Sequence, residues 1–206
     1  MARILKICWA PWQNASRDKR ELSVYRDMGH EVIVMASGEP KDRGTPDTVE
    51  SFSVKRYGVE PFGKKAPIKV NQILSLLNWS RYVCDFKPDI ISGHDFTGWI
   101  VGWLAFLFRK NRPLFIYDAH EFELGRNTKR NKIRTALIRN LERFIIKHSE
   151  FSIMVNDSIA DEVQKEYRLQ RRPIVVRSTP NYWKIDPDVC AKQREAFLKE
   201  FNSLGI

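Results

Sequence analysis

The run Leu114-Phe-Ile-Tyr117 constrains the fold of this chain more than any other stretch. Apolar or aromatic residues in unbroken succession, directly after a proline, predict a strand that is buried on both faces. Strands of that kind occur in parallel sheets whose two faces are covered by helices. This strand runs straight into Asp118-Ala-His120-Glu121. In open α/β sheets, ligands bind outside the carboxyl ends of the strands, so the tetrad lies where chemistry is expected.

Apolar runs and helical patterns alternate along most of the chain. The predicted strands span residues 3–8, 31–36, 51–57, 88–93, 113–117, 151–155 and 173–176. The predicted helices span residues 18–28, 68–84, 97–108, 131–148, 188–201 and a segment capped by residues 156–158 that ends near 167, with loops at 37–49, 60–67, 122–130 and 177–187. This alternation predicts an α/β fold with a doubly wound, mainly parallel, Rossmann-like sheet and helices on both faces. We expect this domain to span residues 1–186, followed by a C-terminal helix within 187–206.

The chain is strongly basic. It has 206 residues, with 35 Lys and Arg against 25 Asp and Glu, for a net charge of +10. Such a surface favours anionic partners such as phosphate-bearing ligands, nucleic acid or an acidic membrane face. Residues 129–147 form a basic segment whose only acidic residue is Glu142, which predicts either a helix on an anionic membrane or a solvated helix face. No nucleic-acid recognition motif is present, so nucleic acid is not expected as a partner.

Several other classes of protein are disfavoured. Residues 9–17, between the first strand and the first helix, contain no glycine, so the dinucleotide-binding fingerprint is missing, and no Walker loop is present. Cys8, Cys84 and Cys190 are isolated from one another, which favours a reducing compartment. The apolar run 99–108 is too short for a bilayer span, which needs about 20 residues, and the N-terminus lacks a signal-peptide layout. We therefore expect a cytoplasmic protein, with peripheral attachment to the inner membrane face as an alternative.

Polar side chains follow most of the predicted strands. They are Arg17 and Arg20 after the first strand, His94 and Asp95 after the fourth, Asp118, His120 and Glu121 after the fifth, Asn156 and Ser158 after the sixth, and Arg177 to Asn181 after the seventh. Each has an ordinary explanation as a helix-start charge, a helix cap or a loop hydrogen bond. Because the carboxyl ends of these strands line one crevice, the set as a whole predicts a functional rim.

Five motifs resemble family 4 glycosyltransferases, in order and at natural spacing. They are Arg3-Ile-Leu-Lys-Ile with Arg17-x-x-Arg20-Glu21 and Met28-Gly-His-Glu-Val32, then Lys87–Asp95, Leu114–Glu121, Ile153–Ala160 and Val175–Asn181. The resemblance covers about the first 180 residues. It implies the N-terminal, acceptor-side half of a GT-B fold. It also implies sugar transfer from a nucleotide-sugar with retention of configuration and without a required metal.

The resemblance also implies roles for individual residues. His120 would lie at the reacting centre as the catalytic residue, in contact with the sugar or the acceptor. The acceptor or substrate would be bound by Arg17, Arg20, His94, Asp95, Asp118, Glu121, Asn156, Ser158 and Asn181. The nucleotide-sugar would be a substrate held mainly by a donor-binding domain, so no cofactor and no metal are expected.

Two departures from the family pattern bear on function. The first loop has Asn14-Ala15-Ser16 where many relatives have two glycines facing the donor phosphates. The segment Ala191–Ile206 resembles the helix that leads into the donor domain, and the sequence goes no further. We therefore expect a hexosyltransferase-type domain of polysaccharide or glycolipid biosynthesis, with a sugar or lipid-linked acceptor. It would be inactive without a donor-binding half, which would be a separate chain or would have been lost by truncation. The alternative is a non-catalytic basic module that binds a membrane or an anion.

Overall fold

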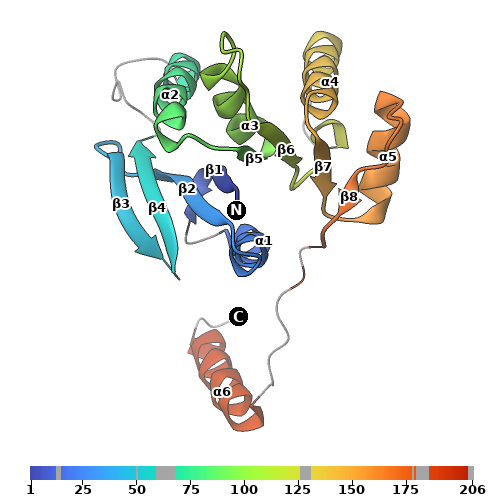
Figure 1. Cartoon of the computed structure of the whole chain (residues 1–206). Coiled ribbons are helices and arrows are strands. Elements are labelled where there is room, and N and C mark those ends of the chain that lie inside the picture. Colours follow the sequence, from blue (N-terminus) through green and yellow to red (C-terminus); the bar gives the residue numbers. More distant parts are fainter. Residues whose placement is uncertain are drawn as a thin grey trace.

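The protein is an α/β domain centred on an eight-stranded sheet, in the order β3-β4-β2-β1-β5-β6-β7-β8 (Figure 1). The computed structural model describes residues 1–12, 15–49, 51–58, 68–125, 131–177, 179 and 186–203. The strands are β1 (Arg3–Pro11), β2 (Glu31–Gly38), β3 (Arg43–Val49), β4 (Phe52–Gly58), β5 (Ile90–His94), β6 (Leu114–Asp118), β7 (Phe151–Met154) and β8 (Ile174–Val175). Neighbouring strands pair in parallel except β3 and β4, which are antiparallel.

Helices cover both faces of the sheet, as the sequence predicts. They are α1 (Ser16–Asp27), α2 (Ile68–Val83), α3 (Asp95–Ala105), α4 (Lys132–Lys147), α5 (Asp157–Tyr167) and α6 (Pro187–Ser203), with short 3-10 turns η2 (Cys84–Phe86) and η3 (Glu123–Gly125). One core lies between the sheet and α2 to α5, and a smaller core lies under α1 (Figure 1). The prediction of a doubly wound, mainly parallel α/β fold is thus confirmed.

The predicted loop over residues 37–49 is wrong, because Arg43–Val49 forms the edge strand β3. Its Gly44 and Pro46 are turn-like residues, and they led to the loop assignment. A proline is tolerated here because an edge strand hydrogen-bonds on one side only. The predicted strands and helices otherwise correspond to observed ones within a few residues. The predicted loop 60–67 and the second half of the loop 122–130 lie outside the described residues.

Two glycines allow the first turn of α3 to pack closely against the sheet. A Cβ at Gly98 would lie 2.2 Å from the carbonyl oxygen of Ile7, and a Cβ at Gly93 would lie 2.4 Å from the backbone of Trp99. No larger residue fits at either position without moving backbone. The close contact fixes His94 and Asp95 at the carboxyl end of β5, where α3 starts.

Candidate active site

Two histidines from neighbouring strands meet at the carboxyl edge of the sheet. His94 ends β5, and His120 follows β6 by two residues. Their imidazole rings lie with centroids 3.9 Å apart. The side chains of His94 and His120 are 14% and 26% exposed, so each ring has one side in the protein and one toward solvent. The structure thus brings together the two histidines that the sequence places on a common rim.

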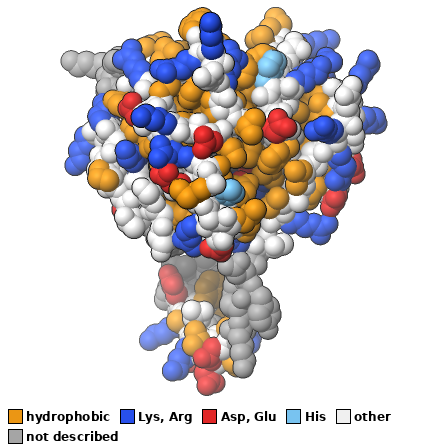
Figure 2. All heavy atoms as spheres, in the orientation of Figure 1, with side chains coloured by type: hydrophobic (Ala, Val, Ile, Leu, Met, Phe, Trp, Pro, Cys, Tyr) orange, Lys and Arg blue, Asp and Glu red, His pale blue; other side chains and the backbone are white. Residues whose placement is uncertain are grey.

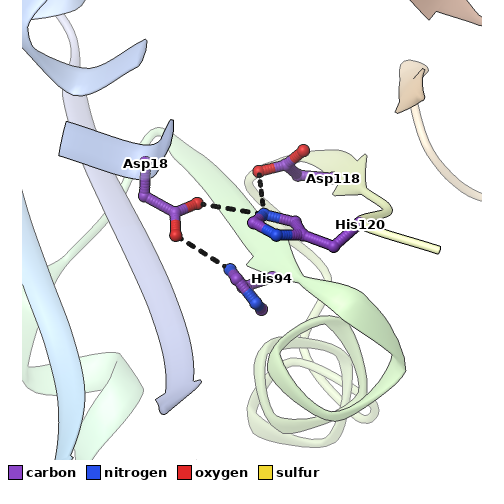
Figure 3. A group of neighbouring side chains, drawn as sticks. All are labelled: Asp18, His94, Asp118 and His120. Carbon is purple, nitrogen blue, oxygen red and sulfur yellow. Dashed lines mark hydrogen bonds and ion pairs between the residues drawn. The ribbon is translucent and has the colours of Figure 1, made fainter. Parts of the chain in front are cut away.

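Asp18 connects the two rings from behind (Figure 3). One carboxylate oxygen of Asp18 lies 3.0 Å from Nδ1 of His94. Its other oxygen lies 3.7 Å from Nε2 of His120, and Asp118 Oδ2 lies at the same distance from that nitrogen. Asp18 is fully buried in the first turn of α1, so the first helix supplies the support for side chains on β5 and β6.

A buried lysine holds the carboxylates in place. Nζ of Lys6, in the middle of β1, lies 2.8 Å from Asp18, 3.0 Å from Glu21 and 2.5 Å from Asp118. The side chain of Lys6 has no solvent exposure. Arg17, which is also buried, donates to the second oxygen of Asp118. Buried charges are tolerated when they are paired in this way, so the site rests on an internal ion network.

The electrostatics of this network favour the charged forms of Lys6, Asp18 and Asp118. Burial alone would lower the pKa of Lys6, but the charges of Asp118, Asp18 and Glu21 raise it well above its ordinary value. Burial would raise the pKa of Asp18 and of Asp118, yet the charge of Lys6 and the nearby histidines hold both well below their usual range. Burial raises the pKa of Glu21 in spite of its contact with Lys6.

Both imidazoles are stabilised in the protonated form. Burial would lower the pKa of His94, but the hydrogen bond with Asp18 outweighs burial and raises the pKa to about 10. Burial also opposes protonation of His120, while Asp118 and Asp18 raise its pKa above the ordinary value. At neutral pH His94 is therefore protonated, with positive charge and N–H donors, and the raised pKa of His120 favours the same form of that ring. Such a pair suits hydroxyl or anionic oxygens of a ligand and cannot act as a general base until it loses a proton.

A pocket of about 250 Å³ opens beside His94. It is lined by Trp9, Ala10, His94, Asp95, Phe96, Thr97 and Glu123. Asp95 has a positive φ of 53°, which is uncommon for a residue with a side chain, and its carboxylate accepts the backbone N–H of His120 at 2.8 Å. A larger pocket of about 600 Å³ lies at the opposite, amino edge of β7, away from the histidines.

The donor set of Asp18, His94, Asp118 and His120 is one that divalent metals such as zinc accept, with ligand atoms within 4.8 Å of one another. The electrostatics fit a metal poorly. The Lys6 ammonium already neutralises both carboxylates from within hydrogen-bond distance. A protonated imidazole has no lone pair to offer a metal. The cluster is therefore better described as an ion network than as a metal centre.

The other predicted site residues do not all lie on the exposed rim. Arg17 and Asp118 are buried in the ion network, so they lie behind the rim rather than on its surface. Arg20 is partly buried, and Glu121 is exposed directly after His120. Asn156 caps α5 by accepting the N–H of Ile159 at 2.8 Å, and Ser158 is exposed in the first turn of that helix. Asn181 lies outside the described residues, as does Asn14 of the first loop.

Three members of the network, Lys6, Asp18 and Glu21, are not among the site residues predicted from the sequence. One signal was available for Lys6, because a lysine interrupts an otherwise apolar run in a strand that should be buried on both faces. Asp18 and Glu21 lie three residues apart in α1, so both reach the same side of that helix. Nothing local separates them from the exposed charges of an ordinary helix.

Comparison with protein families decides the affiliation of the chain. The family model described as Glycosyltransferase Family 4 matches residues 22–180, which is more than half of the sequence. The chain belongs to glycosyltransferase family 4. No curated protein gave a significant match.

Solved structures show where the fold recurs. Sucrose-phosphate synthase from Thermosynechococcus elongatus matches with a TM-score of 0.66 and 12% identity, over 94% of this chain and 53% of that one. S. aureus MnaA, solved with UDP, matches with a TM-score of 0.53 and 13% identity, over 86% and 44% of the two chains. A UDP-N-acetylglucosamine 2-epimerase matches with a TM-score of 0.53 and 11% identity, over 80% and 45%.

This family 4 chain spans about half the length of those solved structures. At such low identity the likeness concerns the fold, and it agrees with the predicted GT-B type of α/β architecture. Across the described part of the chain, no helix has the length and apolar character needed to cross a bilayer.

Proposed function

We propose that this domain is the acceptor-side half of a retaining, hexosyltransferase-type enzyme. It would bind a glycan or lipid-linked acceptor and receive a sugar from a nucleotide-sugar donor, in polysaccharide or glycolipid biosynthesis. The donor would be held mainly by a second, donor-binding half, and neither a cofactor nor a metal would be required. Membership of family 4 supports sugar transfer as the reaction class.

The observation that carries this proposal is the pair of neighbouring histidines beside the pocket at the carboxyl edge of the sheet. A pocket of about 250 Å³ with aromatic walls, a carboxylate and an imidazole has the groups that sugars need. Aromatic rings pack on the apolar face of a sugar ring, while charged groups bind its hydroxyls. Trp9, Phe96, Asp95 and His94 supply these groups together.

His120 is the residue we assign to the reacting centre. Its ring lies against that of His94 at an angle of 41°, has carboxylate oxygens of Asp18 and Asp118 3.7 Å from Nε2 and keeps 26% of its side chain exposed. A fixed imidazole N–H can donate a hydrogen bond to an oxygen on which negative charge grows. Its fixed position also supports the larger contribution to transfer, which is the alignment of donor and acceptor.

The test is to follow acceptor binding separately from turnover. Saturation-transfer NMR of the purified chain with a panel of mono- and oligosaccharides should show binding, which His94→Ala weakens by about tenfold or more. His148→Ala is the matched control, because that exposed histidine lies at the far end of α4 and should leave sugar binding unchanged. Incubation of the chain alone with nucleotide-sugars and acceptors should give no robust turnover.

Two results would contradict the proposal. Robust transfer by the chain alone would show that no second half is needed. Sugar binding that survives His94→Ala, or that His148→Ala reduces equally, would place the acceptor site elsewhere.

A further inference from the structure

Helix α4 carries an apolar row that its own domain leaves exposed. Ile133, Leu137, Leu141 and Phe144 are 73%, 65%, 38% and 39% exposed. These four residues, which we call the apolar row, follow one another at helical spacing over about 16 Å of helix. The opposite side of α4 is buried through Glu142, Ile145 and Ile146. The row therefore points away from the core that holds the helix in place.

Basic side chains flank the apolar row. Helix α4 contains Lys132, Arg134, Arg139, Arg143 and Lys147, all with exposed side chains, and its single acidic residue is buried. At 100° per residue, Arg143 and Lys147 lie along one side of the row and Arg134 along the other. Long basic side chains beside an apolar row are typical of helices that lie in the plane of a membrane surface.

The segment after α3 extends this surface. The indole of Trp103 packs edge-on against Phe144 at 5.4 Å, and the guanidinium of Arg112 lies 4.8 Å from the same indole. Residues 107–112 include Phe108, which is 95% exposed, and the exposed Arg109 and Lys110. Figure 2 shows Lys and Arg side chains beside apolar ones around the upper end of the molecule, where α4 and this segment lie.

We propose that the apolar row of α4, with residues 107–112 beside it, docks this protein on an anionic membrane surface. The apolar side chains would enter the boundary between headgroups and acyl chains, and the flanking cations would contact acidic headgroups. Charge complementarity selects this occupant, because each exposed charge on α4 is positive. A second copy of the chain is disfavoured, since a two-fold contact through this face would set the same cations against each other.

The docking surface is independent of sugar transfer, and its test uses no sugar. Purified protein is sedimented with vesicles of phosphatidylcholine alone and with vesicles that also contain phosphatidylglycerol. Binding is expected to the acidic vesicles only, and it should weaken as salt rises from about 0.1 M to about 0.5 M. The double variant Ile133→Ser/Leu137→Ser should lower partitioning by about tenfold or more. The double variant Arg143→Gln/Lys147→Gln should lower it and flatten the salt dependence.

A matched control comes from α2. Ile73 and Leu77 are 59% and 45% exposed and also lie one turn apart, so Ile73→Ser/Leu77→Ser removes similar apolar surface elsewhere. This control should bind acidic vesicles like the wild type, and thermal unfolding should show that all variants are folded. Failure of the wild type to bind acidic vesicles would overturn the inference, as would equal loss in the α2 control. A dimer that the α4 variant dissociates in the absence of lipid would assign the face to a second copy instead.

Discussion

Asp18 is the residue on which the histidine pair depends. It is the closest carboxylate to His94 and is also shared with His120, and Lys6 fixes it from the other side. A carboxylate in that position favours the protonated form of both rings and limits the rotation of His94, to which it is hydrogen-bonded. We therefore regard Asp18 as a positioning residue that acts through the two imidazoles, which are the groups that we propose contact the substrate.

Replacement of Asp18 by Asn should lower the pKa of His94 from about 10 toward the ordinary histidine value of 6.5. The amide keeps the size of the side chain and removes its charge. Titration of the imidazole nitrogens by NMR measures the change directly. Asp95→Asn is the control, because Asp95 lies 3.5 Å from the other ring nitrogen and is partly exposed, so its effect should be smaller. An unchanged titration in Asp18→Asn would remove Asp18 from its assigned role.

The contact between Asp18 and His94 also predicts how the stability of the protein depends on pH. The folded-state pKa of His94, about 10, lies above the ordinary value of 6.5. Its contribution to stability is therefore fully present below pH 6.5 and is lost as the pH rises through about 10. Urea unfolding from pH 6 to pH 10 should show this decline in the wild type and a flatter profile in Asp18→Asn. Parallel profiles for the two proteins would contradict the assignment.

Lys6→Met tests the buried network itself. Methionine fills a similar volume but leaves the carboxylates of Asp18, Glu21 and Asp118 without their shared cation. Loss of one partner from a buried ion cluster costs about 3–5 kcal/mol, so we expect a decrease of that size in the free energy of unfolding. Arg3→Met is the control: its ion pair with Glu31 is partly exposed and should be worth about 1 kcal/mol or less. Similar losses in the two variants would show that the network contributes no special stability.

Some residues of the site could be predicted from the sequence, and others could not. His94, Asp95, Asp118 and His120 could be placed on one rim, because each directly follows a predicted buried strand. The ion-pair partners of Lys6 could not be predicted from the sequence. They lie 12 to 112 positions away along the chain, and only the folded sheet brings them together. Burial of a charge is a tertiary property that no local pattern records.

At the scale of elements, α4 has apolar residues on both a buried and an exposed side, and its sequence pattern does not tell the two sides apart. The helical spacing places Ile133, Leu137, Leu141, Phe144 and Ile145 on one side, which is ordinarily the core side. In the structure Ile145 is buried and the other four are exposed to differing degrees. A hydrophobic pattern identifies an apolar side, but it does not say whether that side meets the protein's own sheet or an external partner. The edge strand β3 was missed for a similar reason, since pairing with β4 outweighs its turn-like composition.

Glu142 joins three elements and should make their packing sensitive to pH. In α4, its carboxylate accepts the hydroxyl of Tyr117 from β6 at 3.2 Å and that of Tyr167 from α5 at 2.5 Å. Burial raises the pKa of Glu142 from 4.5 to about 7, although both tyrosine hydrogen bonds oppose the shift. The folded state therefore holds the proton more tightly than the unfolded chain, and stability should fall as the pH rises from about 4.5 to 7.

Glu142→Gln should remove that dependence. The variant should gain stability relative to the wild type between pH 5 and pH 8, on the order of 3 kcal/mol at most. Chemical denaturation of both proteins at pH 5 and at pH 8 measures the free energy of unfolding. Glu150→Gln, at an exposed position after α4, should change nothing. A pH profile of Glu142→Gln that runs parallel to the wild type would show that Glu142 does not titrate in this range.

At the scale of the whole molecule, the sequence predicts the fold better than the site. The alternation of strands and helices specifies the α/β class, and the central order follows because right-handed connections place α1 on one face and α2 to α5 on the other. The family match over residues 22–180 omits β1 and the first half of α1, which supply Lys6, Arg17, Asp18 and Glu21. The support behind the histidines therefore comes from the part of the chain that the family pattern describes least.

The final helix should be dispensable for the stability of the rest. All described side chains from residue 186 to residue 200 are exposed, and α6 stands apart from the sheet in Figure 1. Deletion of residues 187–206 should therefore leave a domain that unfolds cooperatively, with a Tm within about 2 °C of the intact chain by calorimetry. Deletion from residue 157 onward is the contrasting variant: it removes α5, with the buried Ala160, Val163 and Tyr167, and should abolish cooperative unfolding. If removal of α6 alone has that effect, residues 1–186 are not an independent domain, and α6 belongs to the same folding unit as the sheet.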